Sequence, residues 1–179
     1  VTLGPWTFPS AGAVPAAFRP LGDLPAPPSP RLLSTSSLTV NSEGRRMSVW
    51  IEDTRPEESS PNPDVFFRYF NGSTWGDAAP IIGANSPNGE WETDPAVVFM
   101  GSNALACWTV NKAQDKTLNT LNEILSFQDI ACAVWDGSAW GAPVKVIDDD
   151  QADGVVSLAF DPTLNKAAAV WVHNADPGK

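Results

Sequence analysis

The sequence predicts an all-β protein built from repeated four-stranded antiparallel sheets. Three observations lead to this prediction. From about residue 32 onwards, short apolar strands alternate with turns. The pattern at 69–76 returns at 134–141, 65 positions later. A strand that ends in tryptophan occurs three times, at Trp50, Trp108 and Trp171. A stacked β-sandwich is the alternative arrangement of such strands.

Composition narrows the class of protein. The 179 residues are 42% hydrophobic, which suits one ordinary globular domain and not a disordered chain. No apolar run has the roughly 20 residues that a membrane-spanning helix needs. A net charge of −10 argues against nucleic acid and against an anionic membrane surface as partners. The single histidine argues against most zinc chemistry and leaves few candidates for a general base.

Residues 1–31 form a proline-rich segment that we expect to be an extended arm. Eight of the 17 prolines fall within the first 30 residues. Proline fixes φ and cannot donate a hydrogen bond to a sheet, so regular structure is disfavoured here. Aromatic residues in the arm, including Trp6, would pin it to the rest of the molecule, and a flexible linker is the alternative. The chain starts without a methionine and ends on turn-forming residues, which favours a piece of a longer polypeptide.

The remainder divides into two complete units and a half unit. The first unit, 32–83, has predicted strands at 33–40, 46–52, 64–70 and 74–82. The second unit, 84–148, has them at 95–100, 104–110, 129–135 and 139–147. The third, 149–179, ends after its second strand. Asn-Gly and Asp-Gly steps at 71–72 and 136–137 predict tight hairpins with positive φ at both positions.

About two and a half repeats of four antiparallel strands indicate blades of a β-propeller. Pro80 and Pro143 fall in the fourth strand of their units, which suits the outer edge of a blade. Segments 94–108 and 136–144 resemble repeats of bacterial extracellular β-propeller proteins. They are also distantly similar to the Asp-box hairpins of sialidases, although the Asp of that box is replaced by Phe70 and Trp135. Complete propellers have about 4–8 blades, so we expect this chain to form part of a larger ring.

Cys107 and Cys132 are the only cysteines, and they fall on consecutive predicted strands. A symmetric hairpin would place them opposite each other, and a disulfide would then add roughly 3 kcal/mol by the loop-entropy estimate. The matching residues of the first unit, Val49 and Phe67, are apolar, so two packed free thiols are the alternative.

An acidic segment between the second and third units gives a candidate calcium site. Asp149, Gln151 and Asp153 offer oxygen ligands at alternate positions and are followed by Gly154. No glutamate stands at the twelfth position, where Phe160 is found, so a solvated acidic turn is the alternative.

The remaining candidate sites are fewer. Trp91 and Trp6 are candidates for stacking on sugar rings, the long connection 111–128 for a binding surface or a cover, and Asn71 for glycosylation. His173 has no obvious Ser or Cys partner, and no catalytic motif occurs, so an enzyme is the less favoured class.

Together these features predict a non-catalytic, structural or interaction module of a secreted or cell-surface bacterial protein, extracellular or periplasmic. Its partners would be other chains or copies of itself that complete the ring, and glycans are a further candidate. The alternatives are a carbohydrate-binding, lectin-like propeller and a fragment of a sialidase-like glycoside hydrolase, which would gather Arg, Asp and Glu at one mouth of the channel.

Overall fold

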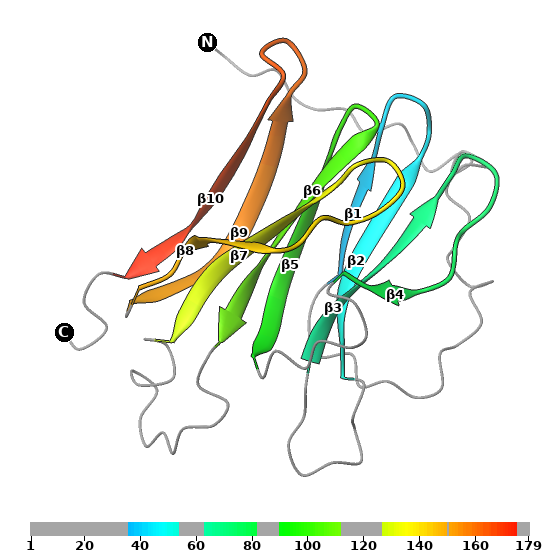
Figure 1. Ribbon diagram of the computed structural model, residues 1–179. Helices are drawn as coiled ribbons and strands as arrows, with labels where there is room; N and C mark the ends of the chain where they lie inside the picture. Colours follow the sequence, from blue (N-terminus) through cyan, green and yellow to red (C-terminus); the bar gives the residue numbers. More distant parts are fainter. Residues whose placement is uncertain (1–35, 54–62, 82–89, 112–126, 150, 175–179) are drawn as a thin grey trace, which may run out of the picture.

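The computed structural model describes residues 36–53, 63–81, 90–111, 127–149 and 151–174, and every regular element in these ranges is a β-strand (Figure 1). Two sheets have four strands and one has two, all antiparallel. The first sheet is formed by β1 (Ser37–Val40), β2 (Arg46–Asp53), β3 (Pro63–Phe70) and β4 (Ala79–Pro80). The second is formed by β5 (Trp91–Met100), β6 (Asn103–Asn111), β7 (Gln128–Trp135) and β8 (Val144–Ile147). The third is formed by β9 (Ala152–Asp161) and β10 (Lys166–Asn174).

The sheets stand side by side with their hairpins at one end, as blades of a propeller do (Figure 1). In both four-stranded sheets the strands lie in chain order. The first strands of successive sheets are neighbours, β1 beside β5 and β5 beside β9. The predicted fold class is confirmed: the protein is all-β, with four-stranded antiparallel sheets in a propeller-like arrangement. The boundaries at residues 31, 83 and 148 stay predictions, and the predicted arm lies outside the described residues.

The main core lies between the first and second sheets. Alternate side chains of β2 point inward, so that Met47, Val49 and Ile51 are all 0% exposed. They pack against the inward side of the second sheet, including Trp108, which is also fully buried. A smaller core joins the second sheet to the third, where Leu158, Ala169 and Trp171 lie over the second sheet. Because side chains alternate between the two faces of a strand, each sheet packs one face against the neighbouring sheet.

Hydroxyl groups of β1 bond directly to the backbone of β5. The Val97 amide donates to Ser37 Oγ at 3.2 Å, and the Phe99 amide donates to Thr39 Oγ1 at 3.3 Å. β5 is the edge strand of the second sheet, so side chains of the first sheet, rather than another strand, satisfy these two amides.

An aromatic cluster closes the same interface near the hairpin end. The ring of Trp135 lies 5.5 Å from Phe67, 5.5 Å from Tyr69 and 5.7 Å from Trp140. Two of these rings belong to the first sheet and two to the second, so the cluster fixes how the sheets pack.

The hairpins at 71–72 and 136–137 differ from the prediction. Only Gly72 and Gly137 have positive φ, at 103° and 104°. Each loop has four residues, because Phe70 pairs with Trp75 and Trp135 pairs with Trp140. Inside the loops, Asn71 Oδ1 accepts the amides of residues 73 and 74, and Asp136 Oδ1 accepts those of residues 138 and 139. The tight two-residue turn was therefore the wrong prediction: the side-chain oxygen, not a second positive φ, holds the loop.

The fourth strands are also shorter than predicted. After single bridges between Phe70 and Trp75 and between Trp135 and Trp140, pairing resumes only at β4 and β8. In both four-stranded sheets, the amide of the glycine after the tryptophan donates to a carbonyl of the third strand: Gly76 to Tyr69 and Gly141 to Val134. The residues after each glycine leave the ladder until β4 and β8 begin. The described part of the chain contains no helix that is long and apolar enough to cross a lipid bilayer.

Candidate functional site

Acidic side chains gather at the end of the sheets opposite the hairpins, and we call this set the acidic end. It comprises Asp53 at the end of β2, Glu92 near the start of β5, Asp129 near the start of β7, and Asp153 near the start of β9. Asp53 is 5% exposed and the other three are 0% exposed. Carboxylates are seldom fully buried without partners, so these positions need explanation.

A repeated β-bulge places two of these acids. The pairing of β5 with β6 shifts after Thr93, and the pairing of β9 with β10 shifts next to Gly154. The residue after each has positive φ, 49° at Asp94 and 56° at Val155. Glu92 and Asp153 therefore occupy equivalent positions in successive sheets, each just before the bulge. Bulges turn side chains away from the regular alternation, and here both acids point inward.

Asp153 is the centre of a small polar network. One oxygen, Oδ1, accepts a hydrogen bond from Trp171 Nε1 at 2.8 Å and lies 2.8 Å from His173 Nδ1. Asp153 and His173 are directly opposite in the β9–β10 ladder. The Asp153 side chain is 0% exposed, whereas 39% of the His173 side chain is exposed. His173, for which the sequence offered no Ser or Cys partner, is an exposed residue that pairs with a buried carboxylate.

The acidic segment after β8 joins this network. The amide of Asp149 donates to Asp129 Oδ1 at 3.2 Å, and the amide of Gln151 donates to Asp149 Oδ1 at 2.9 Å. One ligand atom each of Asp149, Asp153 and His173 lie within 4.8 Å of one another. Two of the three predicted calcium ligands are thus brought together with His173, and Gln151 belongs to the same turn. The calcium assignment itself stays a prediction.

A hollow lies beside this network, between β8 of the second sheet and β10 of the third. Its volume is about 450 Å³, and Ile147, Val170, Trp171 and His173 line it. Its walls are mostly apolar, and among the described residues that line it His173 is the ionisable group.

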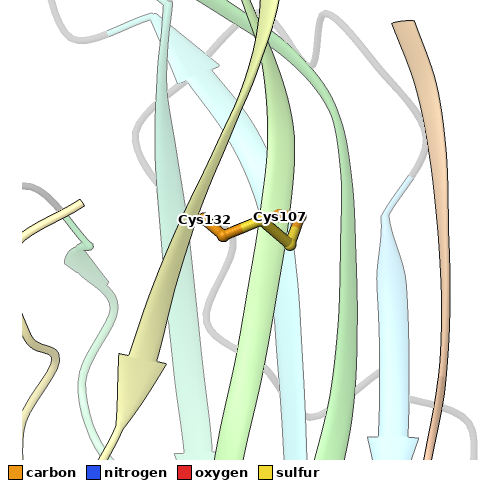
Figure 2. Close-up of a disulfide and its surroundings, with 2 residues drawn as sticks. All are labelled: Cys107 and Cys132. Carbon is orange, nitrogen blue, oxygen red and sulfur yellow. A yellow bond between two sulfur atoms is a disulfide. The ribbon is translucent and has the colours of Figure 1, made fainter. Parts of the chain in front are cut away.

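A disulfide joins Cys107 of β6 to Cys132 of β7 (Figure 2). The two residues are direct partners in the ladder, with Cα atoms 4.1 Å apart. The side chain of Cys107 is fully buried, in the small core that faces the third sheet. The bond thus holds the two central strands of the second sheet together.

Of the two proposed sugar-stacking residues, the structure describes Trp91. Trp91 is 37% exposed at the start of β5, and the ion pair of Glu90 with Lys145, at 2.6 Å, lies next to it in the chain. Trp6 lies outside the described residues, as does most of the connection 111–128. Asn71 is exposed at its hairpin, where its side chain caps the loop.

The arginines of the described ranges do not join the acids. Arg45 and Arg46 are at the start of β2, at the hairpin end, and Arg68 lies near the end of β3, opposite Ser48. The mixed Arg, Asp and Glu mouth expected of a glycoside-processing propeller is therefore not formed by these residues.

Solved structures of a sialidase and of a glycoside hydrolase are similar to the chain at low identity. Trypanosoma rangeli sialidase is 14% identical with a TM-score of 0.47, over 84% of this chain and 29% of that one. A mutant of that sialidase displaying trans-sialidase activity is 16% identical with a TM-score of 0.46, over 72% and 23%. A thermostable family-43 glycoside hydrolase is 13% identical with a TM-score of 0.49, over 79% and 49%.

The chain therefore spans between 23% and 49% of the length of these three proteins. No protein-family model matches it, and the search of curated proteins found no match. At these TM-scores, the fold assignment rests on the register and stacking of the sheets themselves.

The contact between Asp153, Trp171 and His173 was not predicted. Trp171 and His173 are two residues apart and so share a face of β10, which is a readable signal. The position of Asp153 opposite His173 could not be predicted, because it depends on a bulge that shifts the β9–β10 register by one residue.

Proposed function

We propose that the chain is a non-catalytic β-propeller segment of a secreted or cell-surface protein, and that it acts as a structural or interaction module within a larger ring. Other polypeptide or further copies of the chain would supply the missing blades. The observation that carries the proposal is that both ends of the stack of sheets present apolar side chains to solvent.

The first open face belongs to β1. Ser37 and Thr39 bond to the second sheet, so the residues that alternate with them, Leu38 and Val40, point the other way. Both are 56% exposed. On the second and third sheets the corresponding face packs against a neighbour, whereas no sheet of the described residues covers this face of β1.

The second open face belongs to the third sheet. Val155, Val170 and Val172 are 67%, 64% and 61% exposed, and they alternate with Val156 and Trp171, which pack toward the second sheet. Among the described residues β10 pairs only with β9, whereas the other sheets have two more strands outside the second. Unpaired strand edges next to exposed apolar side chains are sites where further strands add.

Two further features support this role. The disulfide suits an oxidising compartment, such as the cell exterior or the periplasm. The acids of the acidic end are 0–5% exposed, so they are better placed to hold the fold than to contact a substrate.

Light scattering on the pure chain tests the proposal. We expect a particle heavier than the 19.1 kDa chain. Leu38→Glu and Val170→Glu, on the two open faces, should each reduce the particle mass, because a buried charge opposes docking. Val144→Glu is the matched control: Val144 is 63% exposed on the outer strand β8, between neither pair of sheets.

A wild-type chain that stays a stable 19.1 kDa monomer at all concentrations would contradict the incomplete-ring proposal. Equal effects of Val144→Glu and Val170→Glu would contradict the assignment of the interface, because they would show a general response to surface charge.

Carbohydrate binding is the second candidate, and the exposure of Trp91 favours it. Sugar rings stack on exposed tryptophan, so a glycan ligand should quench Trp91 fluorescence and lose affinity in Trp91→Ala. Unchanged binding in Trp91→Ala would contradict a site at this residue.

A further inference from the structure

Asp149, Asp153 and His173 form a donor set that the propeller role does not require. They come from three places: the turn after β8, the start of β9 and the end of β10. One ligand atom of each lies within 4.8 Å of the others. Ligand atoms around one tetrahedral Zn²⁺, at about 2.0–2.2 Å from the ion, lie about 3.3–3.6 Å apart. The partly exposed side chains of Asp149 and His173 must therefore rotate toward Asp153 when all three bind one ion.

Buried oxygens around this set lack hydrogen-bond donors in the described part of the chain. Asp153 is 0% exposed, and while its Oδ1 is bonded to Trp171 and His173, its Oδ2 has no partner. Thr109 is 1% exposed, and its Oγ1 also has no partner there. This hydroxyl faces the backbone next to Asp153, because a Cβ on Gly154 would lie 3.5 Å from it. Burying oxygens in this way is unfavourable unless an ion, a water or a donor satisfies them.

We propose that these three residues bind one divalent transition-metal ion of the Zn²⁺ class. Two carboxylates and one imidazole match the ligands of such ions, whereas Ca²⁺ prefers oxygen ligands alone. The chain has a single histidine, which argued against zinc in the sequence, but Asp149 and Asp153 supply the other two ligands. Solvent reaches His173 through the adjoining hollow, so an ion has a route to the site.

The short distance between His173 and Asp153 supports the same assignment, because groups that bind one ion lie close together around it. Here Nδ1 of His173 lies 2.8 Å from Asp153 Oδ1. The buried Asp153 is held in turn by Trp171, so the pair is arranged before any ion binds.

A bound ion would connect two sheets. Asp149 follows the outermost strand of the second sheet, and Asp153 and His173 belong to the third. Its effect would be to fix the third sheet, whose outward face carries the proposed contact with further chain. The site is a structural cross-link, and it does not depend on whether the ring is completed.

The full-length chain, stripped of metal with a chelator, is titrated with Zn²⁺ by calorimetry and by nitrogen NMR of the imidazole. His173 is the only histidine, so its ring signals report the site without ambiguity. We expect one ion per chain, a shift of the His173 ring nitrogens, and a higher melting temperature. Ca²⁺ at the same concentration should not displace Zn²⁺.

Two variants avoid the buried aspartate, whose loss could unfold the chain. His173→Gln and Asp149→Asn should each weaken Zn²⁺ binding by at least about tenfold. Asp77→Asn is the matched control, since Asp77 is exposed in the first sheet and its change removes the same charge. It should bind Zn²⁺ as the wild type does.

The proposal is overturned if the imidazole signals do not move with Zn²⁺. It is also overturned if His173→Gln binds as tightly as wild type, or if Ca²⁺ binds and Zn²⁺ does not. The last result would return the site to the all-oxygen assignment.

Discussion

Breaking the disulfide between Cys107 and Cys132 should lower the free energy of unfolding by about 3.5 kcal/mol. The two cysteines are 25 residues apart, and closing a loop of that length removes about 12 cal/mol/K of entropy from the denatured chain at 25 °C. Urea unfolding of the oxidised and the reduced wild type measures the difference. The comparison keeps both sulfur atoms in place, so it isolates the covalent bond from the packing around it.

The same experiment has a second readout. Reduction frees the segment between the cysteines in the denatured state, so more surface is exposed and the urea m-value should rise. The Cys107→Ala/Cys132→Ala variant is the control, and a reducing agent should leave its unfolding curve unchanged. A stability difference below about 1 kcal/mol with equal m-values would refute the reasoning, because the bond would then not restrict the denatured chain.

Three further predictions concern the hairpin end of the second sheet. Gly137→Ala should destabilise by about 1–2 kcal/mol in urea unfolding, since φ is 104°, while Gly141→Ala, where a Cβ meets only ordinary contacts, should cost less. Equal losses would contradict the strain argument. Trp135→Ala should cost about 3–5 kcal/mol in the same assay, and Trp75→Ala, which has one ring partner and is partly exposed, less than half as much. A larger loss for Trp75→Ala would mean that the aromatic cluster does not hold the sheets together. Amides of residues 139 and 138 lower the pKa of Asp136 from 3.8, so its stabilising contribution should be complete above that value and be lost as pH falls through the folded-state pKa. Asp136→Asn should abolish this acid sensitivity in pH-dependent unfolding, and an unchanged profile would contradict the assignment.

The repeats allowed most of the fold to be predicted. Tryptophan-ended strands and the returning pattern around Trp75 and Trp140 located eight of the strands within a few residues, because each sheet is made of neighbouring segments of chain. The opposite placement of Cys107 and Cys132 followed from hairpin symmetry alone. What limited the prediction was the fourth strand, whose first residues bond to the third strand once and then leave it.

The candidate site was only partly predictable, for a physical reason. Asp149 and Asp153 stand out in the sequence because acidic residues are clustered there. The role of His173 depends on which residue lies opposite it, and the bulge at Val155 changes that by one position. A β-branched residue with positive φ is rare, so no local pattern announces it.

The hydroxyls of Ser37 and Thr39 have a consequence for how the chain folds. Both bonds join residues 60 positions apart, whereas the strands within each sheet are joined by much closer pairings. Short-range pairings close first because they lose less chain entropy, so the individual sheets should form before they dock. During that interval the free amides of β5 are an open edge, which the hydroxyls of β1 cap when the first sheet docks. The pair thus selects the right neighbour and leaves little time for a foreign strand to add.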